Sequence, residues 1–226
     1  MNLLKSHGYP YISPHLPTDG GGSTLTMLDD ANLVRSEIVK LVEDEGKEVV
    51  VVMHSYGGVV GSQACEGLGR VQRQQKGLAG GVIRLYYMCA FVLPAGQSLD
   101  GMLGGPPPFI VTTPDGYRRV EGPANIFYHD LPPDMQAQWV AQLKRIPMLT
   151  QTTPTTFAAY KEIPSTYLYC EDDRAIPFEV QKMMVGGSGV DMHTESIFCS
   201  HSPFLSQPEK LVASIRRAAG EANVTG

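Results

Sequence analysis

The chain has 226 residues, 42% of them hydrophobic and 18% charged, with 24 Gly and 17 Pro, which is typical of a turn-rich globular protein and excludes a disordered chain. The length favours one domain carrying an insertion over two domains. The 18 Lys and Arg against 23 Asp and Glu give a net charge of -5 without a basic stripe, so we expect no nucleic-acid partner.

Helical and strand patterns alternate along most of the chain. The first clear pattern predicts a helix over Asp29–Glu45, with apolar residues on one face and charges opposite. Continuous apolar runs then predict strands that are buried on both faces, and the stretches between and after them predict helices. The expected strands are Lys47–Met53, Val82–Cys89, Thr166–Cys170 and Thr194–Cys199, and the further helices are Gly57–Arg70, Phe178–Val185 and Pro208–Ala219. This alternation predicts a mostly parallel, doubly wound α/β sheet.

One segment interrupts the alternation. Residues 97–163 carry the run Gly104-Gly105-Pro106-Pro107-Pro108 and a helix-like stretch at Pro133–Lys144, but no convincing strand. We interpret this segment as a cap inserted into a single domain of residues 1–226, because long insertions in compact domains tend to be lids or binding elements. Its apolar residues are expected either to line a pocket or to hold the cap to the body, and they are Met102, Phe109, Phe127, Tyr128, Trp139 and Phe157.

A candidate nucleophile follows the Val49–Met53 strand, in the run His54-Ser55-Tyr56-Gly57-Gly58. A serine between a strand and a helix sits on a strained turn that exposes its hydroxyl, while the next amide and the helix N-terminus can face a developing anion. The two glycines are expected to let the helix pass close to the strand. The full G-x-S-x-G motif would have glycine in place of Met53, so an ordinary turn with an N-cap serine is the alternative.

An acid and then a histidine follow in the order that this kind of turn requires. The Tyr167–Cys170 strand runs into Glu171-Asp172-Asp173, and the last strand runs into Ser200-His201-Ser202. Carboxyl ends of parallel strands meet at one edge of the sheet, where a carboxylate can fix the imidazole that activates the serine. We choose Asp173 as this acid and keep Asp172 as the alternative. The non-catalytic alternative is that Glu171-Asp172-Asp173 is an acidic turn exposed to solvent.

The four cysteines, Cys65, Cys89, Cys170 and Cys199, are scattered singly without metal-ligand spacing. We expect buried, reduced thiols of the kind found in cytosolic proteins. No apolar run approaches the roughly 18 residues of a membrane span, and the N-terminus shows no secretory signal. We therefore expect a cytoplasmic protein with no membrane partner, no metal and no cofactor.

Together these motifs resemble the α/β-hydrolase superfamily, and more narrowly its cap-bearing branch of methylesterases, hydroxynitrile lyases and small-molecule esterases. The resemblance spans almost the whole chain and rests on Gly8-Tyr9 with Leu16-Pro17, Val52–Gly58, Cys89–Pro94, Asp173 with Ala175-Ile176-Pro177 and Gln181, and His201–Ser206. It implies that Ser55 is the nucleophile, His201 the base, Asp173 the acid and the Tyr56 amide an oxyanion donor. The candidate substrate-binding residues are His54, Phe127, Tyr128 and Trp139, with a structural role open for His54.

The N-terminus departs from the family pattern. The family has a central strand that ends in a His-Gly loop, which supplies a second oxyanion donor. In this chain Asn2–His7 resembles the end of the family's first helix and Tyr11–Ser13 the strand that follows it, so we expect the usual N-terminal strand to be lacking. The chain is then either a shortened version of an ordinary enzyme or a diverged member that closes its sheet differently.

Three functions fit these residues. The first is cleavage of a carboxylic ester or lactone of a small, largely apolar molecule by a Ser-His-Asp triad. The second is a lyase, decarboxylase or cyclase reaction in the same pocket, with His201 as general base. The third is a catalytically impaired relative that only binds a ligand. The expected partner in each case is a small molecule, and the sequence leaves open whether the chain also forms a homodimer.

Overall fold

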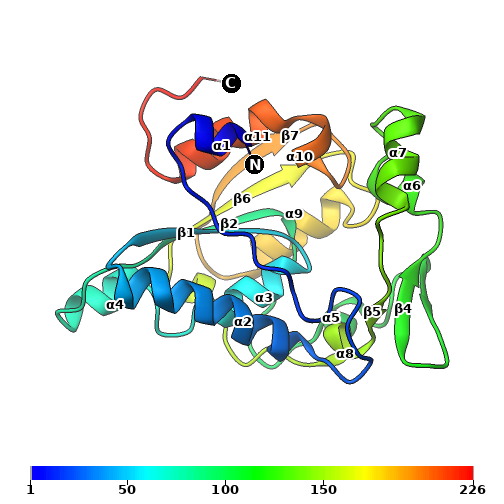
Figure 1. The fold of residues 1–226 in the computed structure, drawn as a ribbon, viewed down its shortest axis with the longest axis horizontal. Coiled ribbons are helices and arrows are strands. Elements are labelled where there is room, and N and C mark those ends of the chain that lie inside the picture. The colour runs from blue at the N-terminus through cyan, green and yellow to red at the C-terminus, as the bar shows by residue number, and fades with distance from the viewer. Residues whose placement is uncertain (1, 226) are drawn as a thin grey trace.

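The computed structural model describes residues 2–225 and has a parallel sheet at its centre (Figure 1). The sheet contains four strands, which are β1 (Glu48–Ser55), β2 (Gly81–Ala90), β6 (Ser165–Cys170) and β7 (His193–Ile197). They lie in the order β1-β2-β6-β7, and every neighbouring pair is parallel. The four expected strands and the parallel α/β class are confirmed.

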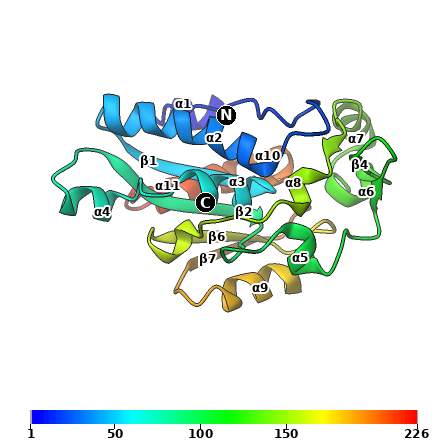
Figure 2. The same ribbon diagram turned by 90° about the horizontal axis from the view of Figure 1, so that it is seen from below.

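Helices cover both faces of the sheet (Figure 2). Those outside segment 97–163 are α1 (Asn2–Ser6), α2 (Met27–Val39) with a π-helical turn (Lys40–Asp44), α3 (Gly57–Ala64), α4 (Arg70–Gln75), α9 (Phe178–Gly187), α10 (Pro203–Ser206) and α11 (Pro208–Ala218). α11 packs on one face with Tyr86 and Met88 of β2, whereas α2, α3 and α9 pack on the other face with Leu85 and Tyr87. Alternate residues of β2 thus enter two separate cores, which explains its continuous apolar run.

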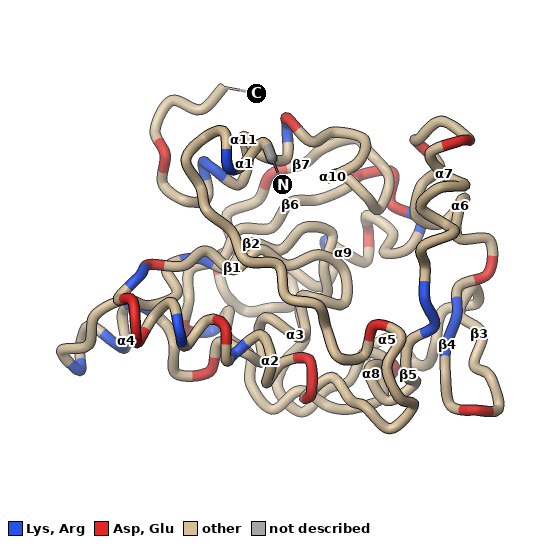
Figure 3. The backbone as a smooth tube through the Cα atoms, viewed as in Figure 1, with Lys and Arg blue, Asp and Glu red and all other residues tan. Residues whose placement is uncertain are grey.

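The helix expected over Gly57–Arg70 is shorter than predicted, and a second helix begins where it should have ended, because glycine interrupts the segment between them. α3 ends at Ala64, Gly67 has φ +72°, and α4 begins at Arg70. Glycine adopts this left-handed conformation without the strain that a side chain would add. Charged residues of both signs lie on α2, whereas the charged residues of α4 are the basic Arg70 and Arg73 (Figure 3). Among residues 2–225 no helix combines the length and apolar character needed to cross a membrane.

Most of segment 97–163 lies to one side of the central sheet, at the right in Figure 1. Its elements are α5 (Leu99–Leu103), β3 (Ile110–Thr112), β4 (Tyr117–Val120), α6 (Pro123–Phe127), α7 (Pro133–Val140), β5 (Ile146–Pro147), α8 (Leu149–Thr152) and a 3-10 turn (Ala159–Lys161). β3, β4 and β5 form a small antiparallel sheet. The expectation that this segment lacks strands is therefore wrong.

The pattern of apolar residues does not predict the strand β4, because a charged residue lies at its buried centre. Arg118 is 4% exposed, and its guanidinium donates to the two carboxylate oxygens of Asp100 at 2.7 and 2.6 Å and to Gln151 at 2.6 Å. A buried cation needs partners of this kind. The contacts tie β4 to α5 and α8, so the strand depends on residues outside its own sequence window.

Tyr11–Ser13, which resembles a strand of the family, forms no strand in this structure. Instead, the chain between α1 and α2 runs past the sheet as a loop (Figure 1). Among the described residues β1 pairs only with β2, which leaves one edge of β1 without a neighbouring strand. Ile12 and Val52 are 52% and 42% exposed.

Candidate active site

The turn between β1 and α3 carries the candidate nucleophile. Ser55 ends β1 with φ +53°, and α3 begins two residues later at Gly57. A serine rarely adopts this left-handed conformation, and such strained residues concentrate at functional sites. The Phe91 amide donates to the Ser55 carbonyl at 3.1 Å, which ties the turn to the end of β2. The predicted strand-turn-helix is present, with a strained serine at its apex.

Glycines bring α3 close to the sheet, and of the two that the sequence indicated only Gly58 does so, together with Gly61. A Cβ atom on Gly58 would lie 2.3 Å from the Phe91 carbonyl oxygen, whereas one on Gly57 would meet nothing within 4 Å. A Cβ atom on Gly61 would lie 2.5 Å from the sulfur of Met53. Gly58 and Gly61 therefore set the distance between helix and strand, and Gly57 does not.

Tyr56 supplies the amide that follows Ser55. Its hydroxyl donates to Oδ2 of Asp30 at 2.8 Å, and the fully buried Asp30 also accepts hydrogen bonds from the amide and hydroxyl of Thr18. Burial, and then the charge of Asp30, raises the pKa of Tyr56 well above its usual value. The phenol is thus held on α2, while the amide lies at the N-terminus of α3, where N–H groups lack intrahelical partners and can face an oxyanion.

Asp173 is the carboxylate that contacts His201. The distance between Asp173 Oδ2 and His201 Nδ1 is 2.7 Å, and the two residues are 5% and 3% exposed. The other oxygen of Asp173 accepts hydrogen bonds from the amides of Ala175 at 2.7 Å and Ile176 at 3.0 Å. Gln181 donates to Oδ2 at 3.4 Å. The carboxylate is therefore fixed by its own turn and presents one oxygen to the imidazole.

Asp172, the alternative acid, faces a different histidine. Its Oδ2 lies 3.0 Å from Nε2 of His129, and its side chain is 41% exposed. The other ring nitrogen of His129 lies 3.1 Å from the carbonyl oxygen of Asn125. Both ring nitrogens of His129 thus have partners within the chain. Of the two neighbouring carboxylates, only Asp173 contacts His201.

Three of the four candidate substrate-binding residues lie around His201. The rings of His54 and Phe127 have centroids 4.5 and 5.4 Å from that of His201. Tyr128 is 8% exposed and packs edge-to-face on Phe127 at 5.8 Å. Trp139 is half-buried on α7, and within residues 2–225 its ring has no aromatic partner. His54 directly precedes Ser55, so its contact with His201 places the His201 ring near the serine turn, although no hydrogen bond joins the side chains of Ser55 and His201 among the described residues.

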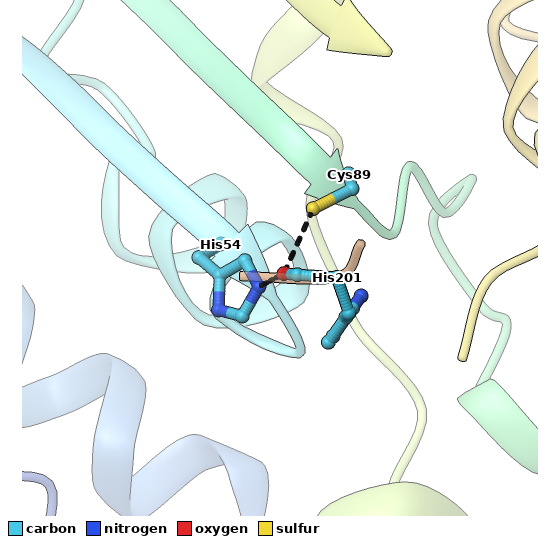
Figure 4. A group of neighbouring side chains, drawn as sticks. All are labelled: His54, Cys89 and His201. Carbon is cyan, nitrogen blue, oxygen red and sulfur yellow. Dashed lines mark hydrogen bonds between the residues drawn. The ribbon is translucent and has the colours of Figure 1, made fainter. Parts of the chain in front are cut away.

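His54, Cys89 and His201 also place potential metal-ligand atoms within 4.8 Å of one another. The space among them is already used by the protein, because His54 Nε2 and Cys89 Sγ both point at the His201 carbonyl oxygen, at 2.7 and 3.4 Å (Figure 4). The His54 and Cys89 side chains thus bind a backbone carbonyl oxygen and do not surround a space where an ion could bind. All four cysteines are buried and unpaired, as expected.

Sequence reasoning missed the residues that link α6 and the loop after it to the His201 loop. Ser200 is fully buried, its amide donates to Asp130 Oδ2 at 2.8 Å, and its hydroxyl donates to the Phe127 carbonyl at 3.1 Å. Burial opposes ionisation of Asp130, but the polar groups around it, Ser200 first among them, outweigh the effect of burial and lower the pKa of this carboxyl. Some 70 residues separate Ser200 from Asp130, so no local pattern marks the pair.

A cavity of about 370 Å³ lies beside this link. Its walls include Asp130 and Met135 from one side and Phe198 and Ser206 from the other. Ser55 and His201 do not line it. The cavity is therefore a neighbour of the His201 loop and is not the space above the serine.

Residues 1–214 match the sequence profile of the alpha/beta hydrolase family, and the chain belongs to that family. It is 38% identical over 208 residues to the alpha/beta hydrolase nvfD of Aspergillus novofumigatus, covering 87% of this chain and 80% of that protein. It is 26% identical over 235 residues to a pyrethroid hydrolase of Sphingobium wenxiniae, covering 94% and 79% of the two chains.

The fold is similar to the crystal structure of polyneuridine aldehyde esterase, with a TM-score of 0.75 at 17% identity, over 96% of this chain and 91% of that one. The family match and the similar fold confirm the resemblance to the α/β-hydrolase superfamily. They also confirm the prediction of an enzyme of the α/β-hydrolase class.

Proposed function

We propose that the protein is a serine hydrolase that cleaves a carboxylic ester or lactone of a small, largely apolar molecule. The observation that carries the proposal is the 2.7 Å contact between Asp173 and His201, whose ring packs on His54, the residue that precedes a serine held at φ +53°. An isolated serine turn or an isolated acidic loop has ordinary structural uses. The buried carboxylate-imidazole pair at such a turn is the arrangement that makes serine a nucleophile.

In this proposal Asp173 accepts a hydrogen bond from the Nδ1–H group of His201, which leaves Nε2 free as the base. Nε2 takes the hydroxyl proton of Ser55 as its oxygen attacks the ester carbonyl, and the Tyr56 amide donates to the oxyanion. The intermediate collapses to an acyl-enzyme, and His201 protonates the departing alcohol. Water, deprotonated by His201, then releases the acid and restores the serine.

The preference for an apolar substrate is supported by the surroundings of His201. Phe127 stacks on the imidazole with an interplanar angle of 29°, and Tyr128 packs behind Phe127. Aromatic walls of this kind bind apolar groups through the hydrophobic effect. A relative of the chain is named a pyrethroid hydrolase, which supports hydrolysis, and a protein of similar fold is named polyneuridine aldehyde esterase, which is compatible with an ester substrate.

Two neighbouring aspartates provide a matched test. We expect Asp173→Asn to lower kcat on a chromogenic ester by about 10³- to 10⁴-fold, because the amide stabilises the wrong tautomer of His201. Asp172→Asn removes the same charge one residue away and should change kcat only a few-fold, because Asp172 contacts His129 instead.

Labelling with a fluorophosphonate probe tests the nucleophile directly. The wild-type protein should be labelled at Ser55, and Ser55→Ala should be neither labelled nor active. Absence of labelling in the folded wild-type protein would contradict the proposal. Substantial turnover by Ser55→Ala would instead support the lyase, decarboxylase or cyclase alternative.

A further inference from the structure

The position of His201 poses a topological problem. His201 follows β7, which lies at one edge of the sheet, whereas Ser55 ends β1 at the opposite edge. The loop after β7 must therefore reach across the ends of β6 and β2 to bring the imidazole to the serine. Hydrogen bonding between strands cannot fix a loop of this kind, so other contacts must hold it.

Two donors hold the main chain of His201 on the serine side of the sheet. His54 Nε2 lies 2.7 Å from the His201 carbonyl oxygen, and Cys89 Sγ lies 3.4 Å from the same oxygen (Figure 4). His54 belongs to β1 and Cys89 to β2, and the pairing of these strands places His54 opposite Met88. Both donors are thus carried by rigid strands, and His54 is covalently next to Ser55.

The protonation state of His54 follows from this contact. A carbonyl oxygen only accepts hydrogen bonds, so Nε2 of His54 must carry the proton. Phe204 packs edge-to-face on the His54 ring at 5.1 Å and holds its orientation. Desolvation, and then the nearby His201, lowers the pKa of His54 to about 3. The ring therefore stays a neutral donor and places no second positive charge beside the imidazole.

We propose that His54 is a positioning residue for His201, and that it acts with Cys89 by holding the His201 carbonyl so that the imidazole meets Ser55. The inference rests on the proposed serine hydrolase function. It assigns His54 a role in the geometry of the reaction instead of the substrate contact expected from the sequence. A misplacement of about 1 Å between reacting groups can lower a rate by about 10²-fold.

Two substitutions of His54 separate hydrogen bonding from space filling. His54→Leu keeps an apolar group of moderate size but removes the donor, whereas His54→Gln keeps an N–H donor at a similar reach. We expect His54→Leu to lower kcat about 10²-fold with KM changed less than about 3-fold, since substrate binding is not affected. His54→Gln should recover most of the lost kcat.

Two buried, unpaired cysteines supply the matched control. Cys89→Ala removes the second donor to the His201 carbonyl and should lower kcat several-fold. Cys65→Ala makes the same change in the core, away from His201, and should leave kcat unchanged. Wild-type kcat in a folded His54→Leu variant would overturn the proposal. Equal losses in His54→Leu and His54→Gln would also overturn it. If His54→Leu does not fold, equal kcat values for Cys89→Ala and Cys65→Ala overturn it.

A readout that does not require turnover separates failure of this inference from failure of the proposed function. The proton between His201 Nδ1 and Asp173 should give a downfield proton resonance. This resonance should shift in His54→Leu and stay close to its wild-type position in His54→Gln. Wild-type protein that neither reacts with fluorophosphonate nor hydrolyses esters contradicts the proposed function, whereas an unmoved resonance in folded His54→Leu contradicts the positioning role.

Discussion

Individual residues at this site both stabilise their own element of the fold and contact the His201 loop. One oxygen of Asp173 closes its own turn through the amides of Ala175 and Ile176, and the other faces His201. His54 extends β1, and its ring meets the His201 loop. Because the same atoms serve the fold and the geometry of the reaction, substitutions here should change stability and activity together, in ways that depend on pH.

At the residue scale, we predict that His54 makes the protein less stable in mild acid. The pKa of His54 is lowered from 6.5 to about 3 in the folded chain, so between these values the unfolded chain binds a proton that the folded chain does not. Stability therefore rises with pH through this window and is lost as pH falls below 6.5. The loss attributable to His54 from pH 7 to 5.5 should be about 1 kcal/mol.

Urea denaturation of wild-type protein and His54→Gln at the two pH values checks this prediction. Glutamine does not titrate, so the variant should lack about 1 kcal/mol of the wild-type loss, while contributions from other groups cancel in the comparison. Equal losses in both proteins would show that His54 titrates normally in the folded chain.

At the scale of secondary structure elements, the serine turn depends on how closely α3 approaches the sheet. The approach is controlled at Gly58, where a Cβ atom would meet the Phe91 carbonyl oxygen, an atom of the backbone that cannot move aside as a side chain could. The same Phe91 peptide also donates to the Ser55 carbonyl. A shift of α3 away from Phe91 would therefore disturb the serine itself.

We predict that Gly58→Ala lowers the free energy of unfolding by about 1–3 kcal/mol, the usual effect of overpacking, and also reduces ester turnover. Gly57→Ala adds the same methyl group to the adjacent residue, where nothing lies within 4 Å. Its stability should be unchanged or higher by up to about 1 kcal/mol, because alanine favours helix. Urea denaturation gives the free energy of unfolding of both variants. Equal destabilisation of the two would contradict the view that Gly58 sets the distance between α3 and the sheet.

At the scale of the whole molecule, the sheet ends in an open edge at β1. Among the described residues no strand pairs with that edge, and Val52, a residue of β1 itself, is 42% exposed. An exposed apolar edge offers unpaired backbone groups to another chain. The residues that would form a dimer or a larger assembly of this chain are therefore expected on β1.

We predict that the 226-residue chain associates in a concentration-dependent way and that Val52→Lys weakens this association, because a charge on an edge strand opposes pairing. Val71→Lys is the matched control, since Val71 is 52% exposed on α4, away from the edge. Sedimentation velocity over a range of concentrations measures both. A wild-type chain that stays monomeric, or equal effects of the two substitutions, would count against an association through β1.

The sequence by itself determined the parallel sheet and the candidate serine, acid and histidine. Strands buried on two faces need unbroken apolar runs, and a strand-turn-helix with small residues has a local signature. The tertiary structure alone decided that Asp173 and not Asp172 meets His201, that Arg118 centres a strand, and that His54 faces a carbonyl oxygen. Each of these depends on a partner that is remote in the sequence, as for His54 and His201, which are 147 residues apart. Propensity and periodicity act over a few neighbouring residues, whereas such partners become neighbours only when the chain folds.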